Sequence, residues 1–299
     1  MKYIQKSVLV IFLVSALAAK THAESNQPSM SVQYKELTSP DFIRAVQEAQ
    51  STCLIPLGVL EKHGPHLPLG TDMIDIREIA LRAAKKEYAI VFPEYYFGQI
   101  HEAKHQPGTL AYSSELIWNV LDETCKELAR NGLKKIILVN GHGGNNNFLR
   151  YFCQSQLESA KDYAVILFTP ETPAELVKEL EGMRKTTTGG HADEVETSMM
   201  LAHRSELVKL EKARDQSGKD QQRLDHLEHG YTGIWWYAKY PNHYAGDGSP
   251  ARAKIGERVL NNRVEQLVEL IKTVKSDEKI LQLQKRFFEE SKHPIKTKQ

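Results

Sequence analysis

Short apolar runs alternate with longer amphipathic segments along most of the chain. The apolar runs lie at 53–59, 88–92, 135–140 and 164–168. Their length and their richness in Leu, Ile and Val predict buried strands. Between them, apolar residues recur at helical spacing after Asp72, before Gly132 and from Phe148 onward. This alternation predicts an α/β fold with three layers, in which a mostly parallel central sheet lies between helices.

The second half of the chain adds further helices. Thr172–Glu175 has the pattern of a capping box with Pro173 at the first helical position. From 251 to about 291 the chain is charged with an apolar stripe, which predicts a helix. No linker interrupts the pattern, so we predict one domain over 24–290 and a loose tail over 291–299.

The N-terminus differs in character from the rest. Lys2 and Lys6 precede an apolar run over 7–19, and small residues follow up to Ala23. This layout predicts a secretory signal peptide over 1–23 and therefore an exported protein, either periplasmic or secreted. The run is short for a bilayer, so we expect no stable membrane anchor after cleavage; an uncleaved anchor is the alternative.

Composition and charge narrow the class of protein. The chain has 299 residues, 41% hydrophobic and 26% charged, which is typical of a folded globular protein. Lys and Arg number 39 against 38 Asp and Glu, so no nucleic-acid or anionic membrane partner is expected. Of the three cysteines, Cys53, Cys125 and Cys153, we expect buried free thiols; a Cys125–Cys153 disulfide is the alternative.

Residues that bind metals gather where the predicted strands end. They form three clusters: Glu61, His63, His66 and Asp72; His142; and His191, Asp193, Glu194 and Glu196. In open α/β sheets, functional groups collect at the carboxyl ends of strands, so these clusters are expected to converge. Carboxylates with imidazoles suit Zn²⁺, Mn²⁺ or Fe²⁺ rather than Ca²⁺.

Each of these residues also has a simpler interpretation. His66, and likewise His101 and His105, could be hydrogen-bonded structural histidines, and Asp193 and Glu194 could be ordinary charges at a helix start. The combination favours a metal site, because converging carboxylates repel one another unless a cation holds them.

Four motifs, taken in order, resemble the creatininase (creatinine amidohydrolase) family. They are Glu61–Pro68 with Thr71-Asp72, Pro107–Thr109, Asn140–Asn145 and His191–Ser198, and the segment 246–257 is similar to the family's C-terminal part. The resemblance implies a binuclear metal centre and hydrolysis of a non-peptide C–N bond in a small amide, often cyclic. It also implies a homo-oligomer, often a hexamer.

The resemblance assigns roles by position. Glu61 and His142 would hold one divalent metal ion, His63 the other, and Asp72 would bridge them. Creatininase has a second-site Glu at the position of Gly144, so here Glu196 is expected to complete that site. Apart from the resemblance, His191 is the candidate proton donor because an imidazole titrates near the working pH, and Glu196 would either ligate or shuttle the proton. Two ions per subunit are expected, Zn and/or Mn, with Fe as an alternative.

Several alternatives stay open at this point. Gly143 stands where creatininase has a substrate-contacting Tyr, so the substrate need not be creatinine. The same site could serve a lactonase or a peptide-trimming hydrolase, and the protein could instead be a non-catalytic exported metal- or ligand-binding protein or a structural module. Four aromatic residues, Trp235, Trp236, Tyr237 and Tyr244, could form a lid over a ligand or fill a core.

Overall fold

The computed structural model describes residues 30–297 and has a four-stranded sheet at its centre. The predicted signal peptide lies outside the described residues. All strand pairs are parallel, in the order β2-β1-β3-β4. The strands are β1 (Thr52–Leu57), β2 (Ile90–Val91), β3 (Lys135–Asn140) and β4 (Ala164–Phe168). Each predicted strand is present, and the expected α/β fold with a parallel sheet is confirmed.

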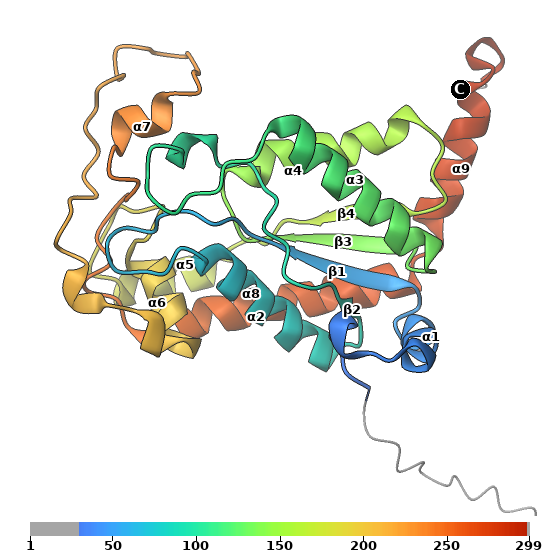
Figure 1. Ribbon diagram of the computed structural model, residues 1–299, viewed down its shortest axis with the longest axis horizontal. Helices are drawn as coiled ribbons and strands as arrows, with labels where there is room; N and C mark the ends of the chain where they lie inside the picture. The colour runs from blue at the N-terminus through green and yellow to red at the C-terminus, as the bar shows by residue number, and fades with distance from the viewer. Residues whose placement is uncertain (1–29, 298–299) are drawn as a thin grey trace, which may run out of the picture.

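Helices cover both faces of the sheet (Figure 1). They are α1 (Ser39–Glu48), α2 (Thr71–Lys86), α3 (Ser114–Arg130), α4 (Asn145–Ser155), α5 (Ala174–Met183), α6 (Glu194–His203), α7 (Trp235–Lys239), α8 (Ala253–Ser276) and α9 (Lys279–Ser291). Helices α3 and α4 lie on one face, and α2 and α8 lie on the other. Layers of this kind bury a sheet on both sides.

The alternation of side chains along a strand divides the core in two. On β3, Ile137 and Val139 pack against α2 and α8, whereas Ile136 and Leu138 pack against α3 and α4. All four side chains are fully buried. The near-continuous apolar composition of these strands follows from this burial on both faces.

Helices α6 and α8 pack against each other with their backbones in close approach. A Cβ atom on Gly256 of α8 would come within 1.9 Å of the carbonyl oxygen of Ser198 on α6. The Ser198 hydroxyl also accepts a hydrogen bond from the Arg252 N–H. The glycine therefore lets α8 lie directly against α6, which carries the candidate residues Glu194 and Glu196 in its first turn.

The structure corrects two local predictions about helices and decides between the two alternatives for the cysteines. Helix α5 begins at Ala174, with Pro173 as its N-cap and no side-chain cap, so the capping box is wrong. The long C-terminal helix is two helices, because Asp277 takes an extended conformation and ends α8. Cys53, Cys125 and Cys153 are free thiols, so the alternative of a Cys125–Cys153 disulfide is wrong.

Within residues 30–297, no helix is long and apolar enough to cross a membrane.

Candidate metal centre

The loop after β1 brings the first cluster to the edge of the sheet. Glu61 and His63 are fully buried, and Asp72 follows in the first turn of α2. The free N–H groups at a helix start favour a carboxylate there. A Cβ atom on Gly58 would meet the Met73 backbone nitrogen at 2.6 Å, so the absence of a side chain lets the end of β1 approach α2 closely.

His142 lies in a tight turn between β3 and α4. The Asn140 side chain holds the turn, because its Oδ1 accepts from the His142 N–H at 3.2 Å and its Nδ2 donates to the His142 carbonyl at 2.8 Å. A Cβ atom on Gly141 would come within 2.7 Å of the Asp72 carbonyl oxygen. The glycine therefore permits the contact between this turn and α2 that places His142 beside Asp72.

The third cluster is ordered by the start of α6. Asp193 is the N-cap residue and accepts hydrogen bonds from the N–H groups of Val195 and Glu196. Glu194 is fully buried and accepts from the backbone of Lys185 and Thr186, which anchors the preceding loop. Both residues therefore have structural roles, and Glu196 points from the first turn toward the other clusters.

Five of the predicted site residues form two groups that share Asp72. Ligand atoms of Glu61, Asp72 and His142 lie within 4.8 Å of one another, and so do those of His63, Asp72 and Glu196. His142 Nδ1 lies 2.8 Å from Glu61 Oε1 and 3.0 Å from Asp72 Oδ2. His63 Nε2 lies 3.0 Å from Asp72 Oδ1 and 3.8 Å from Glu196 Oε1. The two oxygens of Asp72 thus face different groups.

The unpaired atoms and the electrostatics of these groups both fit a cation. Glu61 Oε1 and Asp72 Oδ2 are buried and accept no hydrogen bond from a described residue, although His142 Nδ1 is close to both. Buried polar atoms normally have partners, so orphaned carboxylate oxygens call for a ligand. The donor set of carboxylate oxygens and imidazole nitrogens is one that Zn²⁺ and Mn²⁺ accept.

The pKa values of these groups show how strongly the carboxylates attract positive charge. Burial opposes protonation of His63, yet Asp72 and Glu196 raise its pKa to about 10. For His142 burial is likewise outweighed, here by Glu61 and Asp72, and its pKa rises well above the ordinary value. Burial would raise the pKa of Glu61, but His142 and His191 hold it well below the usual range. Burial and Asp72 raise the pKa of Glu196 to about 8 against the opposing charge of His63.

His191 forms a third possible group with Glu61 and His63, whose ligand atoms also lie within 4.8 Å of one another, and it faces Glu196 as well. Its ring centroid is 4.4 Å from that of His63, and its Nδ1 lies 3.9 Å from Glu196 Oε2. Its Nε2 lies 2.8 Å from the Lys62 carbonyl oxygen, which can only accept, so Nε2 carries the proton. Burial lowers the pKa of His191 to about 3 despite the neighbouring Glu61, so this imidazole is neutral in the described arrangement.

The sequence analysis did not identify His243, which contacts the first group directly. Its ring is 2% exposed, its Nε2 pairs with Glu61 Oε2, and its Nδ1 accepts a hydrogen bond from the Trp236 indole at 2.9 Å. Because Nδ1 accepts, Nε2 is the nitrogen that donates to Glu61. His243 is 182 positions from Glu61, and no spacing rule connects them.

Replacing His243 by alanine is expected to weaken metal binding by about 10–100-fold, because Glu61 would lose the donor that orients it. Chelator competition measures this affinity. His66→Ala is the matched control, because His66 is also buried but pairs with Thr197 and with neither group. Equal affinity in the His243 variant and the wild type would contradict the orienting role.

The remaining predicted histidines pair with the protein backbone. His101 Nε2 lies 2.9 Å from the Tyr112 carbonyl oxygen, and His105 Nε2 lies 2.9 Å from that of Pro241. Neither belongs to the two groups. Both match the structural interpretation that the sequence left open.

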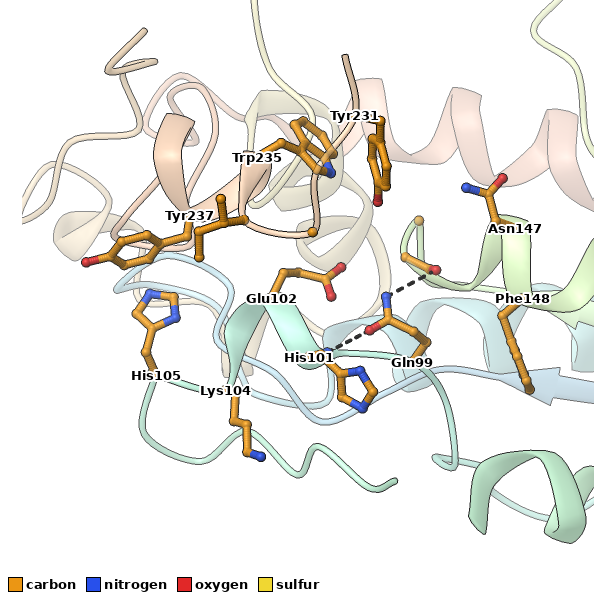
Figure 2. Close-up of a pocket in the computed structure, with 14 residues that line it drawn as sticks. Gln99, His101, Glu102, Lys104, His105, Asn147, Phe148, Tyr231, Trp235 and Tyr237 are labelled. Carbon is orange, nitrogen blue, oxygen red and sulfur yellow. Dashed lines mark hydrogen bonds between the residues drawn. The ribbon is translucent and has the colours of Figure 1, made fainter. Parts of the chain in front are cut away.

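A cavity of about 800 Å³ adjoins the turn that carries His142. Gly143 and Gly144 form part of its wall, and so do Trp235 and Tyr237, which Figure 2 labels. The other two aromatic residues of the suggested lid do not line this cavity: Trp236 bonds to His243, and Tyr244 is almost fully buried. The aromatic segment therefore serves partly as cavity wall and partly as packing.

Comparisons of the sequence and of the structure with known proteins point to the same family. The family model "Creatininase: Creatinine amidohydrolase" matches residues 35–271. Creatinine amidohydrolase of Pseudomonas putida is 26% identical over 204 residues, which cover 62% of this chain and 77% of that protein. The 3-dehydro-scyllo-inosose hydrolase of Thermotoga maritima is 28% identical over 256 residues, covering 76% and 80%. A solved creatininase has a TM-score of 0.70 at 22% identity, covering 83% of this chain and 100% of its own. Further solved creatininases include a Zn-Zn type and a Mn form.

A parallel α/β sheet with carboxylates and imidazoles converging at its edge, together with these relatives, defines a metal-binding hydrolase. The family match spans most of the chain and settles which hydrolase family this is. The chain belongs to the creatininase family, whose members hydrolyse C–N amide bonds, and the resemblance and the enzyme class predicted from the sequence are confirmed.

Proposed function

We propose that this protein hydrolyses a C–N bond of a small amide with two divalent cations, Zn and/or Mn, with Fe as an alternative. Glu61, Asp72 and His142 would hold one cation, and His63, Asp72 and Glu196 the other. Bound cations of this kind activate water at neutral pH and polarise the substrate carbonyl. The observation that carries the proposal is the division of the two Asp72 oxygens between the two groups.

The chain itself would supply hydrogen-bond donors and a proton. The N–H groups of Gly143 and Gly144 donate to no other described residue and lie at the cavity wall, where they suit a developing oxyanion. His191 is proposed to relay a proton to the leaving nitrogen. Its Nε2–H stays with the Lys62 carbonyl, so the proton transferred would be one that Nδ1 receives from the attacking water by way of Glu196 and then gives to the leaving nitrogen.

The variant His191→Ala is expected to keep both metals and to lower kcat by about a hundredfold, because proton transfer to the leaving group is lost while the ligands remain. Metal analysis together with steady-state kinetics checks this. Full turnover in the variant would remove His191 from the proton path, and loss of metal would make it a ligand instead.

The cavity beside the His142 turn shares Gly143 with a smaller cavity of about 360 Å³, which the proposed ligands Asp72 and Glu196 line. The larger cavity, of about 800 Å³, has no proposed ligand in its wall, and its aromatic and polar side chains fit the substituents of a substrate whose amide lies at the metal ligands. The absence of a side chain at Gly143 keeps this space open. We therefore propose that the substrate is a substituted amide, either cyclic or open-chain, rather than creatinine itself.

The experiment that tests the function is an assay of Zn- and Mn-loaded protein against cyclic amides, formamides, lactones and short peptides. Turnover of amides, lost on chelation and restored by metal, supports the proposal. Turnover of lactones alone would favour a lactonase, and turnover of peptides alone would favour a peptide-trimming hydrolase. Bound metal without turnover of any compound would favour a binding protein, and absence of stoichiometric metal would overturn the metal centre.

We also propose, from the N-terminal pattern of charge and hydrophobicity, that the protein is exported and cleaved near Ala23. The family resemblance supports a homo-oligomer. N-terminal sequencing of the protein from the exported fraction tests the first point, and the mass of the native particle tests the second. An uncleaved N-terminus or a monomeric mass would contradict them.

A further inference from the structure

The two ring nitrogens of His142 meet very different surroundings. Nδ1 lies among the carboxylates of Glu61 and Asp72, whereas Nε2 is buried and has no hydrogen-bond partner among the described residues. An unpaired buried donor costs about 1–3 kcal/mol. When a histidine binds metal through one nitrogen, the other N–H usually donates to a carboxylate, a carbonyl or a water. His142 Nε2 therefore lacks a partner that such a ligand normally has.

The missing side chain of Gly144 leaves room beside this nitrogen. A Cβ atom on Gly144 would lie 2.4 Å from His142 Nε2 and 2.7 Å from Glu102 Oε1. A side chain at this position would require one or both of these groups to shift. The space that a Gly144 side chain would fill thus lies between His142 Nε2 and the carboxylate of Glu102.

The segment that carries Glu102 is tied to the turn that carries His142. The Gln99 N–H donates to Asn145 Oδ1 at 2.8 Å, and the Gln99 side chain donates to the Gly144 carbonyl at 3.4 Å. Gln99 Oε1 also accepts from the His101 N–H at 2.7 Å (Figure 2). These bonds fix the backbone on either side of the gap, so the approach of Glu102 to His142 is built into the fold.

The Glu102 side chain is the carboxylate that this arrangement leaves available. It makes no hydrogen bond or ion pair with another described residue, whereas the neighbouring His101 and His105 both pair with carbonyl oxygens. Both Glu102 and Lys104 line the cavity, and Figure 2 shows their side chains running in different directions. No hydrogen bond joins Glu102 to His142 in the structure, and rotation of the flexible glutamate side chain would bring its carboxylate toward Nε2.

We propose that Glu102 is a positioning residue that accepts a hydrogen bond from His142 Nε2–H, an inference that rests on the proposed metal centre. The bond fixes the tautomer of His142, so that Nδ1 is free to bind metal, and it increases the basicity of that nitrogen. Glu102 would act through His142 and would not itself ligate metal. Gly144 is the residue that makes the contact sterically possible.

The test compares metal affinity and the His142 ring proton in full-length wild type, Glu102→Ala and Glu102→Gln, with Lys104→Ala as the matched control from the same cavity wall. Chelator competition with Zn²⁺ measures affinity, and NMR of ¹⁵N-labelled imidazole measures the Nε2–H signal. We expect about 10–100-fold weaker binding in Glu102→Ala, partial recovery in Glu102→Gln because its amide oxygen still accepts, and wild-type affinity in Lys104→Ala. The Nε2–H signal should move upfield in Glu102→Ala.

Other outcomes are distinguishable. Wild-type affinity together with an unchanged Nε2–H signal in Glu102→Ala would overturn this inference alone. A change in KM with unchanged metal affinity would make Glu102 a substrate contact and also overturn it. A wild type that binds no Zn²⁺ would overturn the proposed metal centre and, with it, this role.

Discussion

Replacing Asp72 by alanine should release both metal ions and lower kcat/KM by about a thousandfold or more. One oxygen of Asp72 faces Glu61 and His142, and the other faces His63 and Glu196. Removal of a shared ligand opens both sites at once, and cation stabilisation of the transition state is worth several kcal/mol. Metal analysis of the purified variant, with kinetics on the substrate found in the panel, measures both effects.

Two controls separate this result from general damage. Asp75→Asn changes another buried carboxylate one turn further along α2; Asp75 pairs with His203 at 2.6 Å and belongs to neither group, so both metals should remain. Glu196→Ala should release one ion and retain the other, because Glu196 belongs to one group only. Retention of one ion by the Asp72 variant would contradict the bridging role.

The second large effect is expected at Gly256, far along the chain from the metal ligands. Glycine inside a helix is normally about 1 kcal/mol less favourable than alanine, so Gly256→Ala would stabilise an isolated helix. Here the added methyl would meet the Ser198 carbonyl at 1.9 Å and the Met199 nitrogen at 2.6 Å, both backbone atoms. Overpacking typically costs about 1–3 kcal/mol, and backbone atoms have no rotamer by which to yield, so we expect a loss of about 3 kcal/mol.

Denaturant unfolding of Gly256→Ala, monitored by circular dichroism, measures this loss. The matched control is Gly182→Ala in α5, where a Cβ atom would meet nothing within 4 Å and where a gain of up to about 1 kcal/mol is expected. Because α6 also carries Glu196, separation of α6 from α8 should weaken the second metal site. A Gly256 variant as stable as the wild type would show that the helices can shift apart freely.

Much of the fold could be predicted because the signal is local. The strands β1, β3 and β4 are runs of apolar residues buried on both faces, and such runs can be recognised from the sequence without tertiary information. Helix ends were less predictable. Pro173 was placed inside α5 but caps it, and the break at Asp277 is a backbone choice that the apolar stripe on either side does not reveal.

The candidate site was predictable to the extent that it follows strand ends. Glu61, His63 and His142 come from loops after β1 and β3, and Asp72 from the start of the helix that follows β1; the carboxyl ends of neighbouring parallel strands meet at one edge. Glu196 belongs to the third cluster in the sequence, but only the family resemblance selects it as a ligand, because it follows no strand of the sheet; the start of α6 brings it to the same place.

The sequence by itself determined the layered α/β architecture, the reaction family and the residues that converge, since periodicity and motifs are written into short stretches of chain. Only the tertiary structure decided that His243 orients Glu61, that Glu102 approaches His142 over Gly144, and that Gly256 must lack a side chain. These contacts join residues distant along the chain through packing of loops and helices. Packing depends on the shapes of all the elements together, and no local pattern specifies which surfaces will meet.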